Sequence, residues 1–177
     1  MNADRRTSRT SLLIRAGFTE LDRAARLLDS ERLAPLLDAQ DGDGNGLLGD
    51  LGTAADPDMA LLLLVRLLEA CDEQQWRRLV GALLADADVR RRVIDVIGMS
   101  QELGDFMIRH LEAWEVLADA EGLTQAPAAR EVRAAMLASV GADPLAQDPV
   151  AAMTGTAALD ALRVSYRLHL LGIATRD

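Results

Sequence analysis

The chain has 177 residues, about the size of one ordinary domain, and half of them are apolar, which is enough for a sizeable core. Acidic residues outnumber basic ones 28 to 19, and the formal charge of −9 disfavours nucleic acids and anionic membranes as partners. The single cysteine, Cys71, and the lack of a signal-peptide core or a membrane-length apolar run favour a reducing, cytoplasmic compartment.

Alanine and leucine dominate the composition, β-branched residues are few, and no strand-like alternation appears. These features predict an all-α fold. We expect an antiparallel helical bundle or array of about six to eight helices. Residues 1–10 are polar and are expected to form a flexible N-terminus, whereas residues 11–117 are expected to form the bundle.

In the first third of the chain, short helices precede a glycine-rich segment. The pattern predicts a helix over 11–16, a second helix that Thr19 caps, and a further turn or two over 31–37. Residues 40–53 combine repeated glycines with acidic side chains. This composition predicts a flexible acidic loop.

The predicted loop contains part of a calcium-binding motif. Asp41, Asp43 and Asn45 stand at the first, third and fifth positions of an EF-hand loop, and a turn glycine follows. The twelfth position should supply two carboxylate oxygens, but it is Gly52. We therefore favour a solvated turn, and we expect calcium to leave the protein nearly unchanged.

The middle of the chain shows the clearest helix signals. Asp56-Pro57-Asp58 is typical of a helix start, and the apolar run over 59–68 predicts a helix buried in the middle of the bundle.

Three more helices are predicted to begin at capping residues further on. Asp72 and Gln75 predict a capping box at the start of the first helix. Asp86 is the predicted N-cap of the second helix, which Gly98 is expected to end, and Ser100 is the predicted N-cap of the third. In the helix after Asp72, the predicted inward face consists of Trp76, Leu79, Val80, Leu83 and Leu84.

The last third of the chain is predicted to contain two helices and a linker. Residues 118–155 should form a helix, which begins at Pro127, and then the linker. Residues 156–177 should form the last helix, with Thr156 as its N-cap residue. The helical pattern continues to the end of the sequence, which favours a chain that continues further. The predicted inward stripe of the last helix is Leu159, Leu162, Tyr166, Leu170 and Ile173.

Few residues are spaced for catalysis or metal binding. Cys71 closes an apolar helix, and His110 and His169 are too far apart for metal-ligand spacing. The arginine runs over 77–78 and 90–92 are interpreted as solvated faces, because successive helical residues point in different directions.

One pair of basic residues is placed to receive an anion. Arg163 and Arg167 lie one helical turn apart beside Tyr166, and together they could bind a carboxylate or a phosphate. The alternative is an ion pair with acidic residues of a neighbouring helix.

Several blocks resemble one family in order and spacing. The first is RAGFT over 15–19 followed by AARLL over 24–28, and the second is TAADPDMALLLLVRLLEA over 53–70. The third is residues 89–117, which end in VIGMSQELGDFMIRHLEAWEVL, and the last is ALRVSYRLHLLGIATRD over 161–177. Together they resemble the N-terminal helical region of the actinobacterial glutamine synthetase adenylyltransferase/adenylyl-removing enzyme. The positions that match the family's pattern are Gly98, Ser100, Gly104, Asp105, Arg109 and His110. The chain departs from the pattern at Met99, Leu111 and Gly172.

The resemblance implies a role without catalysis. The family transfers AMP with a Gly-Ser followed by an Asp-x-Asp pair that holds divalent metal, and this chain has no Gly-Ser. Magnesium and ATP are implied for the full-length enzyme, and no cofactor is expected in this chain. The implied partners are the catalytic domain of the same polypeptide and glutamine synthetase, with a homodimer through the last helix as a further expectation. The alternatives are a stand-alone helical interaction module and a calcium-responsive helical protein.

Overall fold

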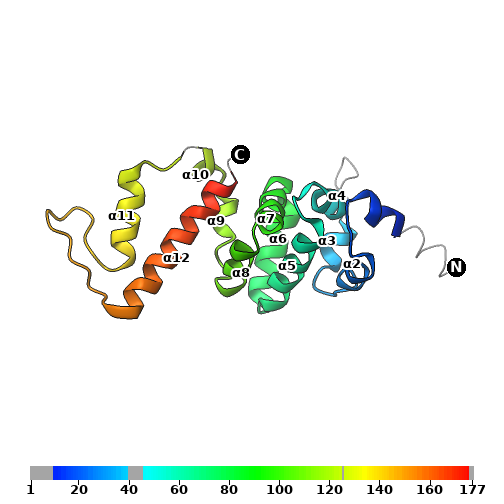
Figure 1. Ribbon diagram of the computed structural model, residues 1–177, viewed down its shortest axis with the longest axis horizontal. Helices are drawn as coiled ribbons and strands as arrows, with labels where there is room; N and C mark the ends of the chain where they lie inside the picture. The colour runs from blue at the N-terminus through cyan, green and yellow to red at the C-terminus, as the bar shows by residue number, and fades with distance from the viewer. Residues whose placement is uncertain (1–9, 40–45, 125, 176–177) are drawn as a thin grey trace. The chain divides into compact units, whose positions relative to one another are not determined.

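The computed structural model describes residues 10–39, 46–124 and 126–175 (Figure 1). These residues form helices and no strand, so the all-α prediction is confirmed. The chain divides into two compact units, residues 1–118 and 119–177. Besides helical residues 10–15, the helices are α2 (Leu21–Leu27), α3 (Ala34–Asp38), α4 (Gly46–Thr53), α5 (Pro57–Ala70), α6 (Glu73–Ala85), α7 (Ala87–Met99), α8 (Gln101–Arg109), α9 (Glu115–Ala118), α10 (Ala120–Thr124), α11 (Ala129–Ser139) and α12 (Gly155–Ala174).

The number of helices exceeds the predicted six to eight. The difference comes from short helices of four to eight residues, such as α4, α9 and α10, which a pattern of apolar spacing does not separate from turns. The antiparallel order of the bundle stays a prediction. Most of the predicted flexible N-terminus, residues 1–9, lies outside the described part of the chain.

Helix α5 forms the centre of the first unit, as the apolar run predicted. It packs against α2, α4, α7 and α8 (Figure 1). Half of its residues are buried, on every side of the helix but one. They are Ala60, Leu61, Leu63, Leu64, Val65, Leu67 and Leu68.

The predicted helix starts of the central region are confirmed. The side chain of Asp56 accepts a hydrogen bond from the Met59 N–H at 2.9 Å. Asp72 and Gln75 form a reciprocal capping box, Asp86 accepts from two N–H groups of α7, and Ser100 accepts from the first turn of α8. On α6, however, Leu84 is exposed rather than inward.

The start of α2 depends on a residue far away in the sequence. Thr19 does not cap this helix as predicted, because Glu20 is the N-cap residue and makes no side-chain cap bond. Instead, the Thr19 N–H and hydroxyl donate to Asp58 Oδ2 at 2.8 and 2.7 Å, and the Glu20 N–H also donates to this carboxylate. Asp58 therefore joins the first turn of α5 to the start of α2.

The predicted flexible loop over 40–53 is wrong for its second half, which forms α4. Leu47, Asp50 and Leu51 of this helix are buried. Gly52 packs so tightly that a methyl group there would lie 3.2 Å from the Cα of Ala16. Gly52 thus permits close packing between α4 and Ala16.

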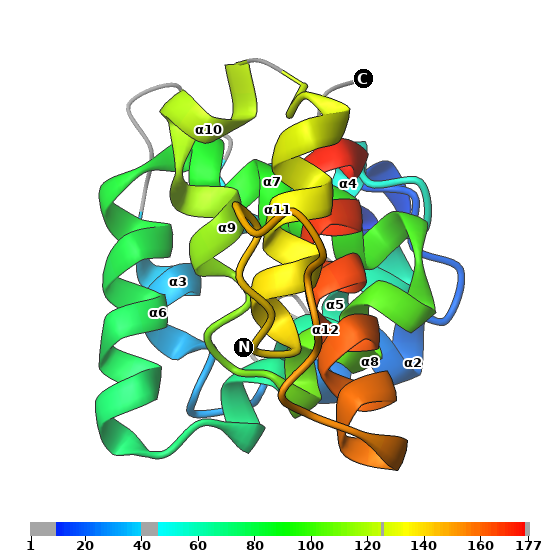
Figure 2. The same ribbon diagram turned by 90° about the vertical axis from the view of Figure 1, so that its left-hand side faces the viewer.

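The second unit contains two long helices that lie side by side, with α12 running back along α11 (Figures 1 and 2). Helix α12 begins at Gly155, so Thr156 lies inside the helix and does not cap it. Of the predicted inward stripe, Leu159, Tyr166 and Ile173 are exposed, and only Leu162 and Leu170 are partly covered. Within the described residues, no helix has the length and apolarity needed to cross a membrane.

Candidate functional site

Two glycines of the family-like motif bring helices into close contact. Gly98 does not end its helix as predicted, because α7 continues to Met99. A Cβ atom on Gly98 would lie 2.7 Å from the Cβ of Ala54 and 3.2 Å from that of Ala60. On Gly104 it would lie 2.7 Å from Leu63 Cδ1. A larger residue at position 98 would therefore push α7 away from Ala54 and Ala60, whereas at position 104 the end of the Leu63 side chain could shift instead.

Polar residues of the same motif fix the position of α8. Ser100 caps the helix, and Asp105 accepts a hydrogen bond from the Arg66 guanidinium of α5 at 2.9 Å. His110 follows the last turn of α8, and its ring centroid is 4.6 Å from that of Phe106. Arg109 is exposed. Apart from Arg109, the motif positions take part in capping and helix packing.

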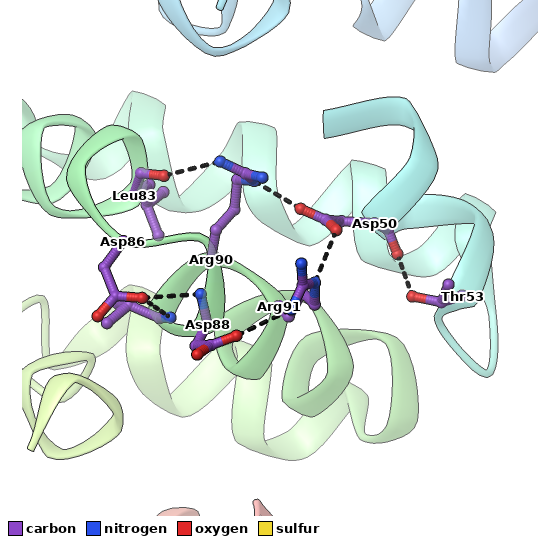
Figure 3. Close-up of polar contacts among 8 residues, drawn as sticks. Asp50, Thr53, Leu83, Asp86, Asp88, Arg90 and Arg91 are labelled. Carbon is purple, nitrogen blue, oxygen red and sulfur yellow. Dashed lines mark hydrogen bonds and ion pairs between the residues drawn. The ribbon is translucent and has the colours of Figure 1, made fainter. Parts of the chain in front are cut away.

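A buried ionic network, which the sequence analysis missed, joins α4 to α7 (Figure 3). Arg90 Nε donates to Asp50 Oδ2 at 2.6 Å, and Arg90 Nη1 donates to the carbonyl oxygen of Leu83 at 3.1 Å. The second oxygen of Asp50 accepts from Arg91 Nε at 3.3 Å. Asp50 and Arg90 are only 4% and 3% exposed. Each of these two charges therefore depends on the other, because both are shielded from water and removal of one would leave the other buried without a partner.

The interpretation of residues 90–92 as a solvated face is therefore wrong for Arg90. Arg90 shares a helix face with Val93, Ile94 and Ile97, all of which are buried. A basic residue on an apolar face was the signal available in the sequence. Its partner, Asp50, could not be identified, because it lies 40 positions away in a stretch that resembled a loop.

Asp95, also on α7, lies beside this network and has an altered acidity. Burial, and then the charge of Asp50, raise the pKa of the Asp95 carboxyl, while Arg91 opposes this effect. A carboxyl with a raised pKa in the folded state destabilises the fold when it is ionised.

We expect Asp95→Asn to raise the free energy of unfolding only slightly at neutral pH, because the asparagine carries no charge but water already screens the charge of Asp95, which is exposed. The advantage should shrink as the pH falls through the raised pKa, and vanish below the unfolded value of about 3.9. Urea unfolding of both proteins at several pH values measures this difference. A variant less stable than the parent at neutral pH would contradict it.

One of the two arginines of the candidate anion site on α12 already forms an ion pair within the helix. Arg163 Nη1 lies 3.0 Å from Asp160 Oδ1, one turn earlier, and both side chains are more than half exposed. Tyr166 is 54% exposed. An ion pair within α12, rather than one with a neighbouring helix, therefore neutralises Arg163. Phosphate binding by Arg163 and Arg167 stays a prediction.

Among the residues that the structure describes, no group of three or more histidine, cysteine or acidic side chains could hold a metal ion. Cys71 is buried, its thiol donates to the carbonyl oxygen of Leu67 at 3.2 Å, and burial raises the pKa of the thiol. A thiol with a raised pKa is a poor nucleophile. The calcium candidates Asp41, Asp43 and Asn45 lie outside the described residues.

These features define a class of protein: an all-α segment in which capped helices, close glycine contacts and a buried ionic network hold the central helices together. No protein-family model matches the chain, and no solved structure matches it.

Curated relatives identify the family. The chain is 39% identical over 174 residues to the bifunctional glutamine synthetase adenylyltransferase/adenylyl-removing enzyme of Streptomyces avermitilis, which covers 98% of this chain and 15% of that protein. The enzymes of the same name from Streptomyces coelicolor and Bifidobacterium longum subsp. infantis are 37% and 36% identical over 100% and 93% of the chain, and 16% and 15% of their own lengths. The chain is thus a homologue of one segment of glutamine synthetase adenylyltransferase/adenylyl-removing enzymes, as the resemblance predicted, and it spans about 15% of their length.

Proposed function

We propose that this chain acts as the non-catalytic, N-terminal helical segment of an enzyme that regulates nitrogen assimilation by reversible transfer of AMP to glutamine synthetase. One observation carries the proposal. The similarity covers 93–100% of the chain but only 15–16% of the relatives. Such a match is what a segment of a larger enzyme gives.

The contacts of the first unit support a packing role. Gly98 and Gly104 allow α7 and α8 to approach their neighbours, and the Asp50–Arg90 pair fixes α4 against α7. Buried groups of this kind determine how helices pack. The segment would present a rigid surface to its partners in the cytoplasm, the catalytic domain of the same polypeptide and glutamine synthetase. In this proposal, ATP and magnesium bind elsewhere on the longer polypeptide.

The proposal predicts that the isolated chain neither transfers nor removes AMP. The purified chain is incubated with glutamine synthetase, magnesium and radiolabelled ATP, and separately with adenylylated glutamine synthetase and phosphate. The intact Streptomyces avermitilis enzyme serves as the positive control. Label should enter and leave glutamine synthetase only in the control. Metal-dependent transfer or removal of AMP by the purified chain would contradict the proposal.

A further inference from the structure

The two compact units of the chain differ in how much apolar surface each of them buries. In the first unit, helix α5 alone buries seven residues. Within the described part of the second unit, by contrast, the buried residues are Val140, Ala142, Leu171 and Gly172. Helix α11 contributes no buried residue. Burial of apolar surface is the dominant force that stabilises a fold, so the second unit has little of that stabilisation.

These four residues are the most that the described part of the second unit can bury with its own atoms. The exposure of a side chain can only rise when a neighbouring part of the chain is taken away, so the core that belongs to the second unit itself is no larger. So small a core cannot offset the conformational entropy that is lost when the residues of the unit become ordered. The second unit should therefore open easily.

The polar contacts of the two units show the same difference. In the first unit, a buried ion pair joins α4 to α7 across 40 positions of the sequence. In the second unit, the Arg163 guanidinium donates to Asp160, only three positions earlier. Two backbone hydrogen bonds, from residues 152 and 153 to the carbonyl oxygen of Val140, close the linker. A short-range bond stabilises the turn in which it lies, whereas a bond between distant elements makes their unfolding cooperative.

We propose that residues 119–177 form a separate unit of low stability, which unfolds and refolds while the first unit stays folded. Proteins open in such steps, and the parts that open most readily are those with few buried apolar contacts. A surface that covers α11 and α12 would then increase their order, because a partner that binds only the folded form stabilises that form. The proposal goes beyond the role in AMP transfer, and its failure would leave the expected AMP-transfer result untouched.

Hydrogen exchange of the full chain, measured by mass spectrometry, tests the difference in stability. We expect the backbone amides in the middle of α11 and α12 to exchange at least about a hundredfold faster than those of α5 and α7. Both tryptophans of the chain, Trp76 and Trp114, lie in the first unit, so their fluorescence shows that this unit stays folded under the same conditions. Protection of α12 equal to that of α5 would overturn the proposal.

Two matched substitutions test whether the units unfold separately. Leu64 on α5 and Leu171 on α12 are both fully buried, and each is replaced by alanine. In urea, Leu64→Ala should lower the midpoint of the transition that tryptophan fluorescence reports, because it removes a core side chain of the first unit. Leu171→Ala should leave this midpoint unchanged, because the second unit has already opened. If Leu171→Ala lowered the midpoint as much as Leu64→Ala does, the two units would unfold together and the proposal would be wrong.

Discussion

Replacing Asp50 with alanine should lower the free energy of unfolding by about 3–5 kcal/mol, because the Arg90 guanidinium then stays buried without its carboxylate. Arg90 is 3% exposed, and its Nε lies 2.6 Å from Asp50 Oδ2. A water molecule that filled the space of the lost carboxylate would carry no charge, so Arg90 would still lack an anionic partner. Urea unfolding of Asp50→Ala and the parent protein gives the difference directly.

An exposed ion pair provides the matched control. Arg77 Nη2 lies 2.9 Å from Glu73 Oε1 on α6, and the Arg77 side chain is 72% exposed. Arg77→Gln should therefore change stability by less than about 1 kcal/mol. The double variant Asp50→Leu/Arg90→Met should lose less than Asp50→Ala, because it leaves no buried charge without a partner at position 90. Equal, small effects of Asp50→Ala and Arg77→Gln would show that Arg90 is hydrated.

Gly98→Ala should destabilise the protein by about 1–3 kcal/mol, although alanine favours helices over glycine by about 1 kcal/mol. The added methyl group would lie 2.7 Å from the Cβ of Ala54 and 3.2 Å from the Cβ of Ala60. A Cβ atom cannot rotate away, so the backbone of α7 itself must shift. Thermal and urea unfolding measure the loss.

Gly81 offers a control of the opposite sign. It lies within α6, and a Cβ atom there would meet nothing within 4 Å. Gly81→Ala should stabilise the protein by about 0.5–1 kcal/mol through helix propensity alone. If Gly98→Ala stabilised the protein as much as Gly81→Ala does, the close contact between α7 and its neighbours would be refuted.

Features that depend on neighbouring residues could be predicted from the sequence. The starts of α5, α6, α7 and α8 were predicted because the capping side chain and the N–H groups it binds lie within three residues. The burial of α5 followed from the continuous apolar run over 59–68. Propensity and periodicity are local properties, and they determine these elements.

Features that depend on distant residues could not be predicted. Asp58 binds the start of α2 from 39 positions away, and Asp50 binds Arg90 from 40 positions away. The structural role of a glycine could not be predicted for the same reason. Gly52 and Gly98 were interpreted as a flexible position and a helix end, whereas both permit close packing against residues that only the fold brings near. Which side of α12 is covered likewise depends on tertiary packing, since Leu159, Tyr166 and Ile173 of the predicted inward stripe are exposed.

Residues that match the family's pattern were predicted by resemblance rather than by physical reasoning. The comparison with curated relatives confirms the resemblance for the chain. The structure adds a physical reason for two of these residues. A side chain at Gly98 would come too close to Ala54, and one at Gly104 would come too close to Leu63.

The most direct test of the proposed function is a segment exchange in the Streptomyces avermitilis enzyme. This chain replaces the matching 174-residue segment, and transfer and removal of AMP are measured beside the intact enzyme and a variant that lacks the segment. A third enzyme carries this chain with Asp50→Ala, which weakens the packing of α4 on α7. We expect that the chimera transfers and removes AMP, that the deletion variant does neither, and that Asp50→Ala lowers the temperature at which the chimera loses activity. A folded chimera that is as inactive as the deletion variant would contradict the account and favour a stand-alone interaction module.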